Sequence, residues 1–109
     1  MLFIASLPMS WAVEYTFRYR DSFQRHLTYA VDKWGTSMTR KYHERRKELE
    51  KIALISPYVF PPSLEYEDVL IRKMVFIGPL VAYLRIEEAQ EKVLFLELWD
   101  GRRAHPPRL

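Results

Sequence analysis

Residues 13–20 alternate between apolar and polar positions, and this alternation predicts the first strand. One set of positions is β-branched or aromatic and the other is polar or charged: Val13, Tyr15, Phe17 and Tyr19 against Glu14, Thr16, Arg18 and Arg20. A period of two with residues of these types is typical of a half-buried strand. We therefore expect a strand over 13–20, followed by a helix that is capped by Asp21 or Ser22.

Two helical patterns come next. The first has apolar residues at helical spacing and stops at Gly35, a residue that commonly ends helices; its stripe is Phe23, Leu27, Ala30, Val31 and Trp34. The second is expected to be capped by Thr36 or Ser37, and its stripe is Met38, Tyr42, Leu49, Ile52 and Ala53. Since Pro57 disfavours helical geometry in the residue before it, this helix should end by Ser56. The short connection predicts an antiparallel helical hairpin.

Two arginines interrupt the second stripe at positions where apolar residues are expected. We expect Arg45 and Arg46 to lay their aliphatic stems over the edge of the stripe and to hold their guanidinium groups in water.

The C-terminal half predicts a sheet. Residues 57–68 contain three prolines and indicate a surface connection. Three strands follow, separated by the turn Gly78-Pro79 and by the stretch 87–91; we place them at about 69–76, 80–86 and 92–99. Connections this short favour antiparallel neighbours. The sequence therefore predicts an α+β fold of order β-α-α-β-β-β, with the helical hairpin packed on one face of an antiparallel sheet.

The alternation of residues along the strand at 80–86 predicts which face of that sheet is buried and which is open. Leu80, Ala82, Leu84 and Ile86 share one side, and Val81, Tyr83 and Arg85 share the other. We expect the first set to lie in the core under the helices. The second set is then expected to line an open, concave face where a partner binds.

Composition narrows the classes of function. A hydrophobic fraction of 49% over 109 residues indicates one folded domain. The absence of cysteine excludes disulfides and thiolate zinc sites. The histidines, His26, His43 and His105, lack metal-ligand spacing, and no Gly-rich phosphate loop or Ser-centred elbow is present. We therefore expect no metal and no cofactor.

The N-terminal residues are apolar but do not match a signal peptide. They lack a basic region, their apolar run is short, and Pro8 interrupts it. No run is long enough to span a membrane. We expect a cytoplasmic protein with no membrane partner, an N-terminal extension over 1–12 and a single domain over 13–109, with either Met1 or Met9 as the natural start.

The charge pattern supplies a candidate site. A net charge of +3 and a pI near 9.3 permit a nucleic-acid or acidic-protein partner. Arginines and one tyrosine gather on and after the last three strands: Arg72, Tyr83, Arg85, Arg102 and Arg103. Guanidinium groups match the geometry of phosphate and stay charged. An RNA-cleaving site also needs a group that moves the 2′-OH proton, and no general base is evident. Solvated residues at strand edges would give the same composition.

The order β-α-α-β-β-β resembles the RelE/ParE toxin superfamily. The resemblance covers about 13–109 and rests on Arg72, the turn Gly78-Pro79, the strand Val81–Ile86, and Leu96–Arg103 running into an arginine- and proline-rich end. That end looks like the ParE-type and plasmid-stabilisation proteins that finish in an Asp-x-Arg-x-x-Pro motif. The resemblance implies a toxin that a cognate antitoxin neutralises by covering the sheet face and the hairpin.

The resemblance leaves the target open. RelE-like members cleave mRNA on the ribosome, and here Arg72, Lys73, Tyr83 and Arg102 would be the catalytic set. However, Leu80 stands where such members carry a basic residue, and Trp99-Asp100 stands where several carry a histidine. ParE-like members poison DNA gyrase without that set, so we favour the ParE-like interpretation. A non-toxic interaction module that kept the fold is a third alternative.

Overall fold

The computed structural model describes residues 11–109, so the choice between Met1 and Met9 and most of the expected extension lie outside the described residues. The elements are β1 (Ala12–Tyr15), α1 (Phe17–Trp34), α2 (Ser37–Ile55), β2 (Ile71–Val75), β3 (Leu80–Glu87) and β4 (Lys92–Asp100), with single 3₁₀ turns η2 (Pro57–Val59) and η3 (Glu88–Gln90). The predicted α+β order is confirmed.

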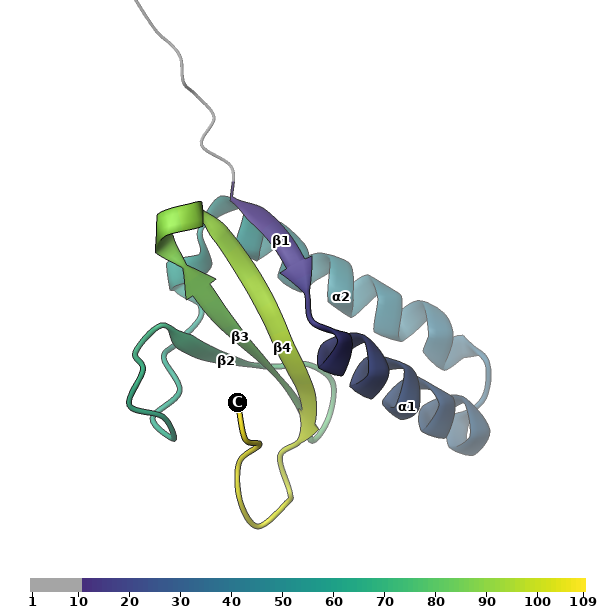
Figure 1. Ribbon diagram of the computed structural model, residues 1–109. Coiled ribbons are helices and arrows are strands. Elements are labelled where there is room, and N and C mark those ends of the chain that lie inside the picture. Colours follow the sequence, from purple (N-terminus) through teal and green to yellow (C-terminus); the bar gives the residue numbers. More distant parts are fainter. Residues whose placement is uncertain (1–10) are drawn as a thin grey trace, which may run out of the picture.

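The sheet has the strand order β1-β4-β3-β2, and both helices lie on one of its faces (Figure 1). Neighbours β2–β3 and β3–β4 are antiparallel, as predicted. The expectation of a wholly antiparallel sheet was wrong for one pair, because β1 runs parallel to β4. A parallel pair needs a long crossover between its strands, and here the helical hairpin and two further strands provide it.

The first helix begins at Phe17, four residues before the predicted cap. The side-chain oxygen of Thr16 accepts a hydrogen bond from the backbone N–H of Tyr19 at 3.0 Å and so caps the helix. Tyr19 is buried and lies one helical turn before Phe23 on the same apolar stripe. Tyr19 therefore fits both the strand alternation and the helical stripe, and the cap selects the helix, so the strand predicted over 13–20 ends at Tyr15.

The helical hairpin follows the prediction closely. The N–H of Gly35 donates to the Val31 carbonyl at 2.8 Å, and Gly35 has a φ of 99°, a conformation that favours glycine. Helix α2 ends at Ile55, before Pro57. The expected cap of α2 is absent, because Thr36 has helical geometry and makes no side-chain capping bond.

The arginines of the second stripe are not simply solvated. Arg45 donates to the carbonyls of Phe76 and Val75 at 2.8 and 2.7 Å, so its guanidinium ties α2 to the end of β2. Arg46 pairs with Glu50 at 2.6 Å, one turn along the same helix.

The core lies between the helices and the sheet. The inward residues of β3 were predicted correctly: Leu80, Ala82, Leu84 and Ile86 are all buried in it. They pack with the stripes of both helices and with Val93, Phe95 and Leu98 of β4.

The opposite face of the sheet is covered, and the expected open face was wrong. Ile71, Val81 and Tyr83 form a second buried cluster against Tyr66, Leu96 and Trp99. The connection after α2 folds back beside β2, where the Ser63 N–H donates to the Ile71 carbonyl at 2.9 Å. Phe60 and Ser63 are themselves buried, so 57–68 is more than a surface connection. The C-terminal residues also reach this face, since the Tyr66 hydroxyl donates to the Pro107 carbonyl at 2.5 Å.

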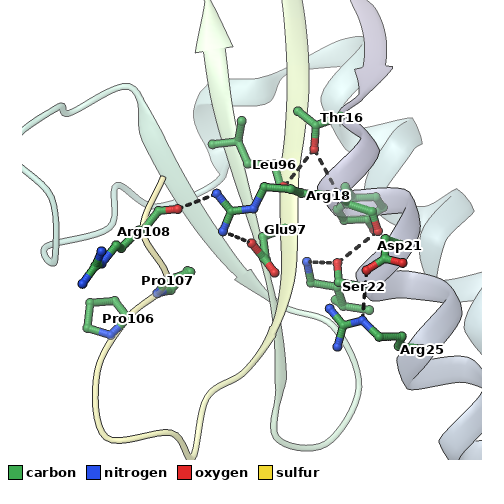
Figure 2. A network of polar contacts seen from close by, with 12 residues as sticks. Thr16, Arg18, Asp21, Ser22, Arg25, Leu96, Glu97, Pro106, Pro107 and Arg108 are labelled. Atoms are coloured by element: carbon green, nitrogen blue, oxygen red, sulfur yellow. Dashed lines mark hydrogen bonds and ion pairs between the residues drawn. The ribbon is translucent and has the colours of Figure 1, made fainter.

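Ser22 fastens α1 to the edge of β4. Its buried hydroxyl accepts from the backbone N–H of Leu98 at 3.0 Å and donates to the Tyr19 carbonyl at 3.1 Å (Figure 2). Ser22→Ala leaves the Leu98 N–H buried without this acceptor, and we expect a loss of about 1–3 kcal/mol in the free energy of unfolding. Urea unfolding measures it. Thr39→Ala, on the exposed side of α2, is the control and should change stability by less than about 0.5 kcal/mol; an equal loss in both variants would contradict the role of Ser22.

Among residues 11–109, neither helix is long and apolar enough to cross a lipid bilayer.

Candidate functional site

The structure separates Arg72 from the other predicted site residues. Along β2, Arg72 pairs with Leu84 and Lys73 pairs with Tyr83, so the two cations lie on opposite faces of the sheet. Arg72 is on the helix side, where it donates to the Phe60 carbonyl at 2.9 Å and lies over the ring of Tyr58 at 5.6 Å. Its guanidinium holds the connection after α2.

Lys73, Tyr83 and Arg103 come together on the far face of the sheet, around a small cavity of about 80 Å³. Two residues that the sequence analysis did not include in the site, Glu65 and His105, line the same cavity. The Glu65 carboxylate accepts from the Tyr83 hydroxyl at 2.7 Å and from the Lys73 ammonium at 3.1 Å. The cavity thus combines two cations with a carboxylate, a phenol and an imidazole.

The protonation states of Glu65 and Tyr83 in this cavity follow from their burial and from the hydrogen bonds that Glu65 accepts. Partial burial raises the pKa of its carboxyl, but hydrogen bonds from Tyr83, Lys73 and Ser63 outweigh burial, so the pKa lies below the usual value. The pKa of Tyr83 is raised by burial and by the bond to Glu65. At neutral pH the site therefore holds an ionised Glu65 and a neutral Tyr83 that donates to it. Tyr83 is only 1% exposed, so an outside group has little access to its ring.

The remaining predicted arginines are paired or stacked. Arg85 pairs with Asp68 at 2.8 Å and also with Glu87. Arg102 binds both carboxylate oxygens of Asp100, at 3.0 and 2.7 Å. Arg103 lies over the ring of Trp99, at 4.4 Å from its centre.

Arg102 and Arg103 serve different places despite being adjacent in the chain. Arg103 lines the small cavity with Lys73, whereas Arg102 lines a larger groove at the tip of the helical hairpin. The structure therefore brings together Lys73, Tyr83 and Arg103 of the predicted residues, and it does not bring Arg72, Arg85 or Arg102 to them.

A β-bulge in β4 shapes this face of the sheet. Tyr83 pairs with Glu97 and Leu84 pairs with Phe95, so Leu96 is an extra residue in β4. The Thr16 hydroxyl donates to the Leu96 carbonyl at 2.9 Å. The bulge turns the next residue, Glu97, toward the far face, next to Tyr83.

Arg18 joins this buried Glu97 to the C-terminal residues (Figure 2). Its guanidinium pairs with the Glu97 carboxylate, which is 8% exposed, and donates to the Arg108 carbonyl at 2.6 Å. Together with the bond between Tyr66 and Pro107, this contact holds the chain end over the far face of the sheet.

The pair Asp100–Arg102 gives a pH dependence at the end of β4. Hydrogen bonds from the Arg102 side chain and backbone lower the pKa of Asp100 to about 2. Because this pKa is depressed, the pair's contribution to stability is complete above the ordinary Asp pKa of about 4 and is lost as the pH falls through about 2. We expect the Asp100 carboxyl ¹³C shift to titrate near pH 2, and the Arg102→Ala variant to titrate nearer 4. An Asp100 midpoint near 4 in the unchanged protein would contradict the assignment.

Comparisons with known proteins address the fold. No family model matches the sequence, and no curated protein matches it. Among solved structures, a chain of the chromosomal ParDE toxin–antitoxin system from P. aeruginosa superposes with a TM-score of 0.64 at 13% identity, covering 84% of this chain and 96% of that one. A chain of the toxin–antitoxin complex RelBE2 from Mycobacterium tuberculosis superposes with a TM-score of 0.49 at 15% identity, covering 82% and 95%.

The first likeness covers most of this chain and nearly the whole of that one. At this identity the likeness concerns the arrangement of elements and not the residues of the site. The chain has the fold of the RelE/ParE toxins.

Proposed function

We propose that the chain is the toxin of a toxin–antitoxin pair, that it acts in the cytoplasm as a ParE-like poison of DNA gyrase, and that a cognate antitoxin neutralises it. The observation that carries the proposal is the fold, which a chain of a ParDE toxin–antitoxin system shares over nearly its whole length. The preference for gyrase rests on where the predicted catalytic residues lie.

Those residues do not form one RNA-cleaving set. Arg72 lies on the helix side of the sheet, bonded to the Phe60 carbonyl. Tyr83 is buried and neutral, and Arg102 is held by Asp100. A phosphate on the far face would therefore meet one of the four predicted groups, Lys73. A protein that binds and poisons its target does not need the full set, which favours the ParE-like function.

Purified gyrase tests this proposal. We expect the chain to inhibit supercoiling of relaxed plasmid by DNA gyrase and to leave a type I topoisomerase unaffected, since the proposed target is the gyrase protein and not DNA. Full supercoiling at a large molar excess of the folded chain would overturn the gyrase assignment.

An mRNA endonuclease is the second candidate, and the far-face cavity favours it. Lys73 and Arg103 could hold a phosphate there, Glu65 is ionised and could accept the 2′-OH proton, and the His105 imidazole lines the same cavity. This site predicts that Arg103→Ala lowers cleavage of ribosome-bound mRNA by roughly a hundredfold. Arg102→Ala, outside the cavity, should leave cleavage unchanged. An absence of cleavage by the unchanged chain would eliminate this candidate.

A further inference from the structure

An apolar groove of about 500 Å³ lies at the tip of the helical hairpin, away from the far-face cavity. Its walls come from the end of α1, the start of α2, the turn between β2 and β3 and the end of β4. The volume falls within the range of about 300–1,000 Å³ that is usual for small-molecule sites. At about 30 Å³ for each water, the groove has room for roughly 15 waters, and therefore for a ligand with about as many non-hydrogen atoms.

The groove has a buried floor and an exposed rim. Tyr42 and Leu80 form the floor and are 3% and 6% exposed, whereas Tyr29 and Trp34 at the rim are 57% and 59% exposed. The rings of Tyr29 and Trp34 meet edge to face at 5.9 Å. Met38 lines the same groove, and an unbranched methionine side chain adapts to irregular apolar shapes. Exposed apolar residues that gather at one place indicate a surface that a ligand covers, whereas single ones do not.

One cation of the groove has no partner in the described part of the chain. Arg102 binds both carboxylate oxygens of Asp100, so these two lining residues neutralise each other. Lys41 also lines the groove, and within residues 11–109 it forms no ion pair. Burial and the charge of Arg25 lower the pKa of His26, so this lining ring is uncharged at neutral pH. The groove therefore combines apolar walls with a single uncompensated positive charge.

This combination selects among the possible occupants. A second copy of the chain, packed groove to groove, would set Lys41 and Lys33, which lies over the Tyr29 ring at 5.8 Å, against the same cations of the first copy. A nucleic acid carries a regular row of phosphates and needs several cations to neutralise them. An apolar molecule with one anionic group matches both the walls and the charge.

We propose that the groove binds a small amphipathic carboxylate of the chemical class of a medium-chain fatty-acid anion. The apolar part lies between Trp34 and the β2–β3 turn, and the carboxylate pairs with the Lys41 ammonium. A carboxylate of twelve carbons has about 14 non-hydrogen atoms, which matches the room in the groove. This site goes beyond the proposed function, and its test needs only the purified chain.

Titration of dodecanoate into the ¹⁵N-labelled full chain, below the concentration at which dodecanoate forms micelles, tests the site. We expect saturable shifts at the backbone amides of Trp34, Met38 and Gly78, and none at Lys73 or Tyr83 of the far-face cavity. Dodecyltrimethylammonium has the same alkyl chain with the opposite charge, and it should bind at least about tenfold more weakly. Equal binding of the two amphiphiles would overturn the proposal.

Two pairs of variants separate the groove from the rest of the surface. Lys41→Glu and Arg40→Glu make the same charge change at neighbouring exposed positions of α2, and of the two only Lys41 lines the groove. Lys41→Glu should weaken dodecanoate binding at least about fivefold, with the larger effect at low salt, and Arg40→Glu less than about twofold. Trp34→Ala removes a wall and should weaken binding at least about tenfold. Phe17→Ala, which removes an exposed aromatic residue from the opposite end of α1, should leave binding unchanged.

Equal losses in Lys41→Glu and Arg40→Glu, or unchanged binding by Trp34→Ala, would overturn the proposal. Shifts that spread over the whole surface without saturation would also overturn it, because they mark non-specific adsorption of an amphiphile. Circular dichroism of each variant verifies that it is folded. If Trp34→Ala does not fold, the comparison of Lys41→Glu with Arg40→Glu decides the outcome, since both positions are exposed.

Discussion

Replacing Leu84 with alanine is expected to lower the free energy of unfolding by about 2–5 kcal/mol. Leu84 is fully buried (0% exposed) in the central strand β3, and it packs in the core between the helices and the sheet. The truncation removes apolar contacts and leaves a cavity that close-packed neighbours fill only in part. Since small domains are stable by about 5–15 kcal/mol in total, this single change removes a large share of the stability.

Urea unfolding followed by circular dichroism measures this effect. The matched control is Leu64→Ala, the same substitution at a residue that is 96% exposed, and it should change the free energy of unfolding by less than about 0.5 kcal/mol. Similar losses in the two variants would mean that Leu84 does not lie in a packed core, and the placement of the helices over this face of the sheet would then be wrong.

Arg18→Ala is expected to cost about 1–3 kcal/mol and to loosen the C-terminal residues. The change leaves the Glu97 carboxylate, which is largely buried, without its cation, and it removes the donor to the Arg108 carbonyl (Figure 2). Burying an unpaired charge is costly, but about half of the Arg18 side chain is in water, so the effect stays below that of a fully buried pair.

Arg25→Ala is the control for Arg18→Ala, because it breaks an exposed pair with Asp21 on the same helix. Exposed pairs contribute little, so we expect a change of less than about 1 kcal/mol. Backbone ¹⁵N relaxation should show larger motion at Arg108 and Leu109 in the Arg18 variant and not in the Arg25 variant. Unchanged motion at these residues would contradict the role of Arg18 in holding the chain end.

The parts of the fold that the sequence predicts well are those with local signals. Gly35 and Pro57 mark the ends of the two helices, and the inward face of β3 is continuous in apolar residues. The start of α1 was missed because Tyr19 fits both the strand period and the helix period, and the deciding contact is the bond from the Tyr19 N–H to the Thr16 side chain.

Features that depend on contacts between residues far apart in the sequence could not be predicted from the pattern of apolar and polar positions. The far face of the sheet was expected to be open, yet Tyr66 and Pro107 cover it from segments that are 41 positions apart. Nothing in residues 57–68 alone signals that they fold back along β2. The parallel pairing of β1 with β4 is likewise a contact between the two ends of the described chain.

The candidate site was predicted only in part, because some of its contacts also join residues that are distant in the sequence. Strand alternation alone separates Arg72 from Lys73, and this separation was available from the sequence. Glu65 was visible as part of an acidic stretch, but its bonds to Tyr83 and Lys73 depend on the loop returning over the sheet. The different surroundings of Arg102 and Arg103 follow from the path of the chain after Asp100.

Pulse-labelling of DNA and protein synthesis after tightly controlled induction of the chain in bacterial cells tests the gyrase assignment in living cells. We expect DNA synthesis to fail first, because gyrase is the proposed target. Earlier failure of protein synthesis would contradict the gyrase assignment and favour the far-face cavity around Lys73 and Arg103 as an RNA-cleaving site. If neither DNA synthesis nor protein synthesis changes while the folded chain is present in the cells, the toxin function itself is contradicted. Only the assignment of the fold would then stand.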